Sequence, residues 1–321
     1  MRFIVYGAGA IGGVLGARLA GAGKDVVLIA RGAHLEAIRR DGLTVEAPSG
    51  RTVHPIKAAA HPAEIEWTQG DVALLAMKGM DTEAALRELA AVAPPETPIV
   101  CVQNGVANER AALRMFANVY GVCVMFPATH LEPGVVQAQS EPITGLLDLG
   151  RYPEGVDDTA EAIAAALRDA TFESVPRPDI MRWKYTKLLM NLGNSIDALC
   201  GRDEDRSDVL ARIREEGEAA LAAAGITFTP WETDRERRGD LLQVKPINGQ
   251  QRSGGSSWQS LARGTGSIEA DYLNGEIVLL GRLHGVETPV NELARRLANQ
   301  AARAGTPPGS FTPDRILELV H

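Results

Sequence analysis

The sequence predicts an α/β protein with an open, doubly wound parallel sheet at the N-terminus and an all-helical C-terminal domain. Two observations lead to this expectation. As far as residue 177, short apolar runs alternate with helical patterns, which is typical of strands joined by crossover helices. Beyond Pro176-Arg177-Pro178, helical periodicity dominates. With 321 residues the chain is long enough for two domains, which we place at 1–177 and 178–321.

The first domain is expected to contain its strands in short apolar runs separated by amphipathic segments. The runs DVALLAM at 71–77 and IVCV at 99–102 are continuously apolar, as in parallel strands buried on both faces. A hairpin is expected around Pro48-Ser49-Gly50, and edge strands within 127–153. The expected strands are 3–6, 26–30, 71–77, 99–102, 120–125 and 172–175, and the expected helices are 10–22, 32–40, 81–93, 108–116 and 156–170.

The second domain is expected to consist of four main helices. Asp179 and Ser207 are candidate N-caps of the first two helices. A segment at 229–264, which includes GGSS at 254–257, reads as irregular. The expected helices are 179–200, 207–224, 267–284 and 289–304.

The most informative motif is the glycine turn between the first strand and the first helix. It reads Gly7-Ala8-Gly9-Ala10-Ile11-Gly12, the G-x-G-x-x-G of a Rossmann-like dinucleotide site in its strand–turn–helix context. Gly7 permits the tight turn, Gly9 lets the backbone approach a pyrophosphate, and Gly12 lets the helix pack on the strand. We therefore expect Gly7, Gly9, Ala10, Ile11 and Gly12 to bind a dinucleotide at the helix N-terminus.

The second strand ends in Ile29-Ala30-Arg31, where an NAD site usually places a carboxylate for the ribose 2′-hydroxyl. A guanidinium is suited to a 2′-phosphate because it forms bidentate, charge-assisted hydrogen bonds. The sequence therefore predicts NADP(H) as the cofactor. The alternative is that Arg31 is a solvated arginine at a strand end.

Composition excludes several functional classes. The net charge is −8 and no basic stripe is present, so nucleic-acid binding is not expected. The sequence has no uninterrupted apolar run of 18 residues, so no membrane span is expected. The 3 cysteines and 6 histidines have no metal-ligand spacing, so no metal site is expected. We expect a cytoplasmic enzyme, and the oligomeric state stays open, with a homodimer as one option.

Polar side chains that could form a second half of the site lie on the expected 179–200 helix. Lys187, Asn191 and Asn194 have i, i+4, i+7 spacing, which places them on one helix face. This face could line a polar cleft or be a solvated stripe. Elsewhere, Lys78 and Asn104 follow two expected strands, at the edge where doubly wound sheets bind ligands. Asn104 could instead lie in an ordinary turn, and Lys78 could simply be solvated.

Taken together, the segments resemble the ketopantoate (2-dehydropantoate) reductase family over nearly the whole chain. The lysine helix and the E-x-D-x-x-N-G segment at 269–275 are the specific parts of this resemblance. The matching segments are GAGAIG at 7–12, Arg31, Met77-Lys78, Gln103-Asn104-Gly105, the stretch from Lys187 to Asn191, Ser256-Ser257, the stretch from Ile268 to Gly275, His284-Gly285-Val286 and Pro289.

The resemblance implies a role for each matching residue. Lys187 would be the general acid that protonates the ketone oxygen, and Glu269 would orient this lysine and bind a substrate hydroxyl. From its position alone, Glu269 could instead be a first-turn residue that the helix dipole favours. Lys78 and Asn104 would lie around the nicotinamide ribose and the substrate. The implied substrate-binding residues are Asn104, Asn191, Asn194 and Ser257.

The sequence departs from the family pattern near the implied substrate site. Gly254-Gly255 stands where the family often has an asparagine, and Ser257 is followed by Trp-Gln-Ser-Leu. Trp183 lies four residues before Lys187, which is not the common spacing, so Lys184 remains a second candidate for the acid.

The leading hypothesis is NADPH-dependent reduction of 2-dehydropantoate to pantoate, a step of pantothenate and coenzyme A precursor biosynthesis. A paralogous reductase of another small-molecule 2-oxo acid and a non-catalytic NADP(H)-binding redox sensor are the alternatives.

Overall fold

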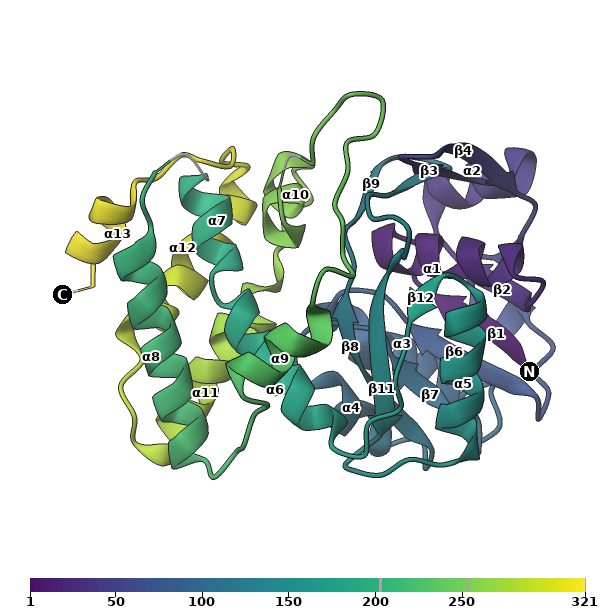
Figure 1. The fold of residues 1–321 in the computed structure, drawn as a ribbon, viewed down its shortest axis with the longest axis horizontal. Coiled ribbons are helices and arrows are strands. Elements are labelled where there is room, and N and C mark those ends of the chain that lie inside the picture. Colours follow the sequence, from purple (N-terminus) through teal and green to yellow (C-terminus); the bar gives the residue numbers. More distant parts are fainter. Residues whose placement is uncertain (202–203, 253, 321) are drawn as a thin grey trace. The chain divides into compact units, whose positions relative to one another are not determined.

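The computed structural model describes residues 1–201, 204–252 and 254–320. Its contacts divide the chain into two compact units, and Figure 1 labels their helices and most of their strands. The first unit contains Met1–Asn104, Asn108–Lys184 and Trp231–Arg252. The second contains Gly105–Ala107, Tyr185–Pro230 and the described part of Ser253–His321. The division of the contacts falls after Lys184, and a later segment returns to the first unit.

The first unit is built on an eight-stranded sheet of order β12-β11-β8-β7-β6-β1-β2-β5. The expected doubly wound sheet is confirmed, but β11 runs antiparallel to β8, so the sheet is not purely parallel. No helix lies between these two strands to provide the crossover that a parallel pair requires. The strands are β1 (Arg2–Tyr6), β2 (Asp25–Ile29), β5 (Lys57–Ala59), β6 (Asp71–Leu75), β7 (Ile99–Cys101), β8 (Val119–Met125), β11 (Gly145–Arg151) and β12 (Phe172–Glu173).

A smaller four-stranded sheet has the order β4-β3-β10-β9. The expected hairpin is confirmed, since β3 (Leu43–Ala47) pairs antiparallel with β4 (Gly50–His54). The expected edge strands within 127–153 divide between the two sheets. Strands β9 (Ala128–Glu132) and β10 (Val135–Ala138) pair in the small sheet, whereas β11 joins the large one.

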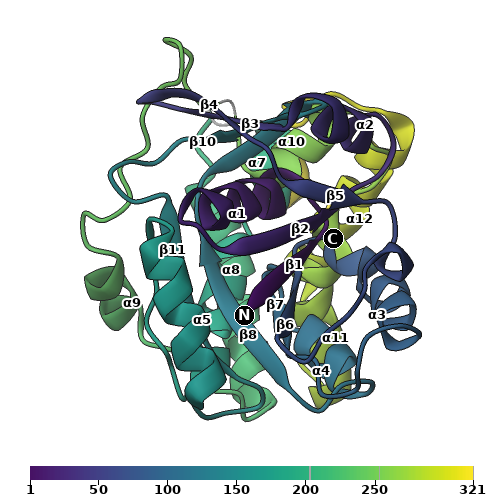
Figure 2. The same cartoon turned by 90° about the vertical axis from the view of Figure 1, so that its right-hand side faces the viewer.

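The large sheet separates two apolar cores, because its side chains alternate between its faces. Phe3 and Val5 of β1 belong to a core that also contains side chains of α1 (Ala10–Gly21) and α5 (Asp158–Asp169). Their neighbours Ile4 and Tyr6 belong to the other core, with α3 (Thr82–Ala90) and α4 (Asn108–Leu113). Figure 2 shows these helix pairs on opposite sides of the sheet. The remaining elements of the first unit are α2 (Gly32–Asp41), α9 (Trp231–Arg238), η1 (Pro62–Glu64) and η2 (Gly79–Asp81).

The described elements of the second unit are all helical, as expected. The helix α6 (Ile180–Asn191) begins in the first unit and continues into the second. The remaining elements are α7 (Asn194–Cys200), α8 (Ser207–Ala223), α10 (Ser256–Ala262), η3 (Glu269–Tyr272), α11 (Asn274–His284), α12 (Pro289–Ala304) and α13 (Pro313–Glu318).

Three expectations for the helical part were wrong. The helix expected over 179–200 breaks after Asn191, because the Asn274 amide takes the Leu192 carbonyl at 3.0 Å and so replaces a helical donor. The helix expected over 267–284 starts as the separate turn η3, and Leu273, with φ −113° and ψ −88°, leaves the helical region before α11. The segment 229–264, expected to be irregular, contains α9 and α10.

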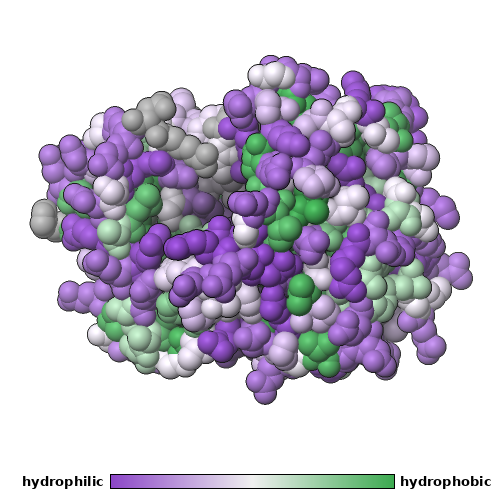
Figure 3. All heavy atoms as spheres, in the orientation of Figure 1, coloured by the Kyte–Doolittle hydropathy of each residue, from purple (hydrophilic) through white to green (hydrophobic). Residues whose placement is uncertain are grey.

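The face drawn in Figure 3 is mainly hydrophilic, with apolar side chains in small separate groups. Among the described residues, no helix combines the length and the apolar character that crossing a membrane requires.

Candidate functional site

The glycine turn has the geometry that its sequence predicts. Gly7 has φ +97°, and a Cβ on it would lie 2.8 Å from the Met77 backbone nitrogen. A Cβ on Gly12 would lie 2.1 Å from the Gly7 carbonyl oxygen, so α1 packs on β1 only because residue 12 lacks a side chain. A Cβ on Gly9 would meet no described atom within 4 Å. The fold thus requires Gly7 and Gly12, whereas Gly9 faces open space.

This open space lies at the start of α1, whose first residues are Ala10 and Ile11. Gly9 is the N-cap, and because it has no side chain it cannot cap the first amides of α1. The first amides of a helix have no carbonyl partner within it, and together with the helix dipole they favour an anion. The residues present therefore fit the pyrophosphate of a dinucleotide.

Arg31 lies at the tip of β2, directly before α2, with its side chain 71% exposed. Its Nη2 is 3.5 Å from the Tyr6 hydroxyl and 3.7 Å from Glu88 Oε2. The hydrogen bond to Tyr6 and the charge of Glu88 raise the pKa of Arg31. Both contacts are longer than the distance of about 2.7–2.9 Å of a strong charge-assisted bond, so the guanidinium can rearrange toward a ligand.

Lys78 and Asn104 follow adjacent strands, because Leu75 of β6 pairs with Cys101 of β7. These strand ends lie at the same sheet edge as the glycine turn, since β6 also pairs with β1. The Gln103 amide links the two ends by donating to the Met77 carbonyl at 3.0 Å. The structure therefore brings together the strand ends that carry the two predicted residues.

Lys184 has a structural environment that sequence reasoning missed. Its ammonium lies 2.7 Å from Glu109 Oε1 and donates to the carbonyl oxygens of Gln103 at 2.9 Å and Val122 at 3.1 Å. The Lys184 side chain is 2% exposed. Three oxygen atoms thus surround this buried ammonium, and one of them belongs to the residue before Asn104.

The other predicted polar residues lie in the second unit. Lys187 is half-buried and Asn191 is buried, and both lie on α6 one turn apart. Asn194 lies on α7, beyond the helix break. The expectation that Lys187, Asn191 and Asn194 share one continuous helix face was therefore wrong. Ser257 is buried on α10, and half-buried Glu269 begins η3.

Contacts within the second unit bring parts of this set together. Helix α7 packs against α10, and a Cβ on Gly255 would lie 4.0 Å from Asn194 Oδ1. Asn194 is therefore close to the start of the helix that carries Ser257. Gly105, with φ +79°, approaches η3 so closely that a Cβ would lie 2.9 Å from the Tyr272 carbonyl oxygen.

A buried amide network, also missed from the sequence, fixes the break between α6 and α7. The Asn274 side chain accepts from Ser195 Oγ at 2.7 Å and donates to the Leu192 carbonyl and to Asn291 Oδ1, each at 3.0 Å. The Asn291 amide in turn donates to the Ile213 carbonyl at 2.9 Å. Asn274 stands in the E-x-D-x-x-N-G segment, so the signal was present but its structural role was not evident.

The two departures from the family pattern near Ser257 are connected in space. A Cβ on Gly254 would lie 2.4 Å from Cγ of Trp258. The indole therefore occupies the space that a side chain at residue 254 would need. Glycine at 254 and tryptophan at 258 form one packing unit in this chain.

Comparison with known proteins agrees with this geometry. The family model described as "Ketopantoate reductase PanE/ApbA" matches residues 3–153, and "Ketopantoate reductase PanE/ApbA C terminal" matches residues 179–302. A 2-dehydropantoate 2-reductase of Mesorhizobium japonicum is 31% identical over 338 residues, covering 93% of this chain and 98% of that protein.

Solved structures share the fold over nearly the whole chain. A PanE/ApbA family ketopantoate reductase from Ralstonia eutropha JMP134 aligns with a TM-score of 0.79 and 25% identity, covering 95% of this chain and 99% of that one. D-Mandelate dehydrogenase, in a ternary structure with NADH and anilino(oxo)acetate, has the same fold, with a TM-score of 0.81 at 20% identity, covering 96% of this chain and 100% of that one. Both halves of the chain match, so this protein belongs to the ketopantoate reductase family.

Proposed function

We propose that this chain reduces 2-dehydropantoate to pantoate with NADPH. The relatives named 2-dehydropantoate 2-reductase support this substrate, because they match the chain over almost its full length. The observation that carries the proposal is the glycine turn, in which packing requires Gly7 and Gly12 while Gly9 leaves space for a ligand.

The preference for NADPH rests on Arg31. Its guanidinium is exposed and has only long contacts to Tyr6 and Glu88, so a 2′-phosphate could draw it away from them. No carboxylate stands at residue 31 itself to accept the ribose hydroxyl of NADH. Arg31 would then bind the phosphate through two parallel charge-assisted bonds.

A bound nicotinamide dinucleotide would supply the hydride. Lys187 would donate its proton to the ketone oxygen, where negative charge develops. Glu269 would orient the Lys187 ammonium and accept a hydrogen bond from a substrate hydroxyl. The substrate would be bound by Asn191, Asn194 and Ser257. Lys78 and Asn104 would lie around the nicotinamide ribose and the substrate.

Lys184 is unsuited to be the acid, because three oxygen atoms enclose its ammonium away from solvent.

A second candidate is reduction of a different 2-oxo acid by the same residues. The packing of Trp258 on Gly254 favours it, because this pair lies beside Ser257, where the sequence departs from the family pattern. A bulky aromatic side chain at this place would alter the size of the substrate that fits.

Steady-state oxidation of NADPH with a panel of 2-oxo acids tests both candidates. The expected result is the highest kcat/KM with 2-dehydropantoate, compared with straight-chain, branched and aromatic 2-oxo acids. A higher kcat/KM with another member would select the second candidate. Turnover with none of them, together with tight NADPH binding, would instead indicate a redox sensor.

A further inference from the structure

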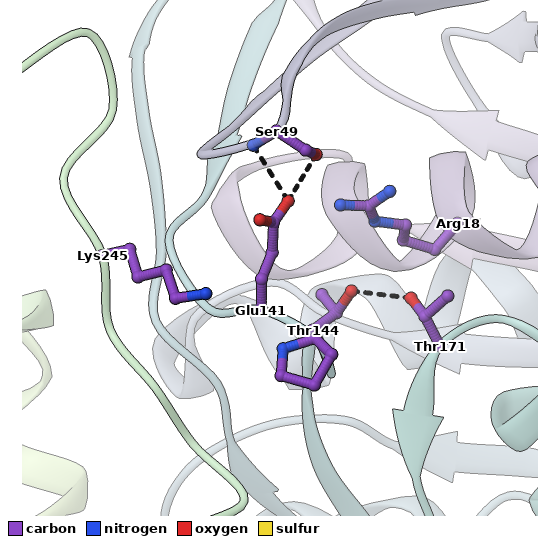
Figure 4. A pocket seen from close by; sticks show the side chains of 7 residues that line it. Arg18, Ser49, Glu141, Thr144, Thr171 and Lys245 are labelled. Atoms are coloured by element: carbon purple, nitrogen blue, oxygen red, sulfur yellow. Dashed lines mark hydrogen bonds between the residues drawn. The ribbon is translucent and has the colours of Figure 1, made fainter.

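A pocket of about 350 Å³ lies in the first unit, apart from the glycine turn (Figure 4). It is lined by side chains from α1, the small sheet, the loop before β11, the end of α5 and the returning segment 231–252. Arg18 reaches it from the second half of α1. At about 1.5 Å of rise per residue, Arg18 is roughly 12 Å along the helix from Ala10. The pocket is thus separate from the proposed dinucleotide site.

Arg18 brings a charged group to this pocket without a strong partner. The guanidinium is half-buried, and its Nε has no hydrogen-bond partner among the residues that the structure describes. Burial lowers the pKa of Arg18, and the charge of Glu141 opposes this shift. A buried charged donor normally has an acceptor, so this geometry leaves an acceptor to be supplied from outside the chain.

A second cation faces the same space. Figure 4 shows that the side chains of Arg18 and Lys245 point toward Glu141 from opposite sides. The Lys245 backbone amide donates to the Gln139 carbonyl at 2.8 Å, which fixes this part of the returning segment. Glu141 itself accepts from the backbone amide of Ser49 at 3.1 Å and from its hydroxyl. Two positive charges therefore face one carboxylate that already has a partner.

The pocket wall also contains a strained residue. Thr171 has φ +68°, in the left-handed region that a β-branched residue rarely adopts and that glycine usually occupies after a helix. Its hydroxyl lies 2.7 Å from the Thr144 hydroxyl, and its carbonyl accepts from the Thr144 amide at 2.8 Å. Residues with such strain cluster at active sites and at places that hold a ligand. Threonine here places a hydroxyl on the pocket wall that glycine would not provide.

We propose that this pocket binds a small hydroxylated phosphate ester. Arg18 and Lys245 would bind the phosphate, which carries nearly two negative charges and three acceptor oxygens at neutral pH. Of the hydrogen-bonded hydroxyls of Thr144 and Thr171, one would donate to the same oxygens, and Glu141 would accept from a hydroxyl of the ester. The volume is at the lower end of the range of about 300–1,000 Å³ for small-molecule sites, which matches a ligand of a few carbons.

Isothermal titration calorimetry with glycerol 3-phosphate and with inorganic phosphate tests the proposal in the absence of any dinucleotide. The wild-type chain should bind glycerol 3-phosphate more tightly than phosphate. Arg18→Met and Lys245→Met should each weaken glycerol 3-phosphate at least ten-fold. Arg40→Met is the matched control, because Arg40 is exposed and pairs with its neighbour Asp41.

Two further variants separate the ligand from the fold. Glu141→Ala should reduce the preference for glycerol 3-phosphate over phosphate. Thr171→Gly should raise the thermal unfolding midpoint by relieving strain, yet weaken glycerol 3-phosphate, which a purely structural threonine would not do. Unchanged binding in both Arg18→Met and Lys245→Met, or no binding by the wild-type chain, would overturn the proposal. Equal affinities for glycerol 3-phosphate and inorganic phosphate would overturn the claim that the pocket recognises a hydroxylated ester rather than phosphate alone. Because the readout is binding rather than turnover, these outcomes are independent of the proposed reaction.

Discussion

Lys184 and Glu109 form an ion pair inside the first unit, with 2.7 Å between Nζ and Oε1 and with side chains only 2% and 0% exposed. Two buried charges are tolerated because each compensates the other and because backbone carbonyls complete the shell of the ammonium. The pair thus links the start of α6 to α4, and the hydrogen bond to the Gln103 carbonyl links Lys184 to the strand end before Asn104.

Removing the lysine alone should be strongly destabilising. Lys184→Met leaves the Glu109 carboxylate buried without a counter-charge, so we expect a loss of about 3–5 kcal/mol in the free energy of unfolding. Urea unfolding measures it. The double variant Lys184→Met/Glu109→Leu should recover most of the loss. Arg87→Met is the control, because Arg87 and Glu83 are each 71% exposed and their pair should contribute less than about 1 kcal/mol. Equal effects of Lys184→Met and Arg87→Met would contradict the importance of the pair.

Lys187→Ala should act on catalysis rather than on folding. Loss of a general acid typically lowers the rate by about 10²–10⁴, so kcat should fall by about 100-fold or more while the Kd of NADPH stays nearly constant. Stopped-flow kinetics and fluorescence titration measure the two quantities, with Lys57→Ala, an exposed lysine on β5, as the control. A normal kcat in Lys187→Ala would assign the proton to another group.

Arg31→Ala should weaken NADPH much more than NADH. A hydrogen bond to a charged group contributes about 1.5–3 kcal/mol, which corresponds to roughly ten-fold or more in the Kd of NADPH. Glu88→Gln should strengthen NADPH, because Glu88 attracts the guanidinium that the phosphate would need. Arg40→Ala, on the helix α2 that follows Arg31, is the control for general charge. Equal weakening of both dinucleotides in Arg31→Ala would show that Arg31 does not contact the 2′-phosphate.

Substitutions at Gly12 and Gly9 should have different effects, one on stability and the other on dinucleotide affinity. Gly12→Ala places a Cβ 2.1 Å from the Gly7 carbonyl and should lower the thermal midpoint markedly. Gly9→Ala meets no described atom within 4 Å, so the thermal midpoint should hardly change, whereas dinucleotide affinity should fall because the methyl group enters the ligand space. Differential scanning fluorimetry, with and without NADPH, distinguishes them. Normal NADPH affinity in Gly9→Ala would show that Gly9 does not belong to the dinucleotide site.

Substrate preference should respond to the contact between Gly254 and Trp258. Gly254→Ala places a Cβ 2.4 Å from the indole and must displace it. We expect the ratio of kcat/KM values between two 2-oxo acids of different size to change, with the KM of NADPH unchanged. Gly70→Ala is the control, since a Cβ there meets no described atom within 4 Å. A constant ratio of kcat/KM values would show that Trp258 does not influence which substrate is preferred.

The parallel strands and the glycine turn could be predicted because their signals are local. The run from Phe3 to Gly12 contains both the buried strand and the residues that its turn requires. The sheet edge then follows from topology, so it was also predictable that the strands before Lys78 and Asn104 end at the same edge.

The errors came from long-range side-chain contacts. Periodicity over 179–200 favours one helix, but the Asn274 amide, far along the chain, takes the Leu192 carbonyl and moves Asn194 onto a second helix. Likewise, nothing in the sequence around Lys184 indicates that its ammonium is buried. The groups that accept its hydrogen bonds come from residues about 60 to 80 positions earlier in the chain. The roles of Lys187 and Glu269 remain predictions.

The return of Trp231–Arg252 to the first unit has a consequence for synthesis on the ribosome. Arg237 donates two hydrogen bonds, at 2.8 and 2.9 Å, to Asp148 on β11, whose side chain is 5% exposed. The nascent sheet therefore lacks one cation beside Asp148 until α9 has emerged, after α6, α7 and α8 have been translated. The first unit is therefore complete only once residues as far as Arg252 have been translated, and a fragment ending near residue 177 should be less stable than the same residues in the whole chain.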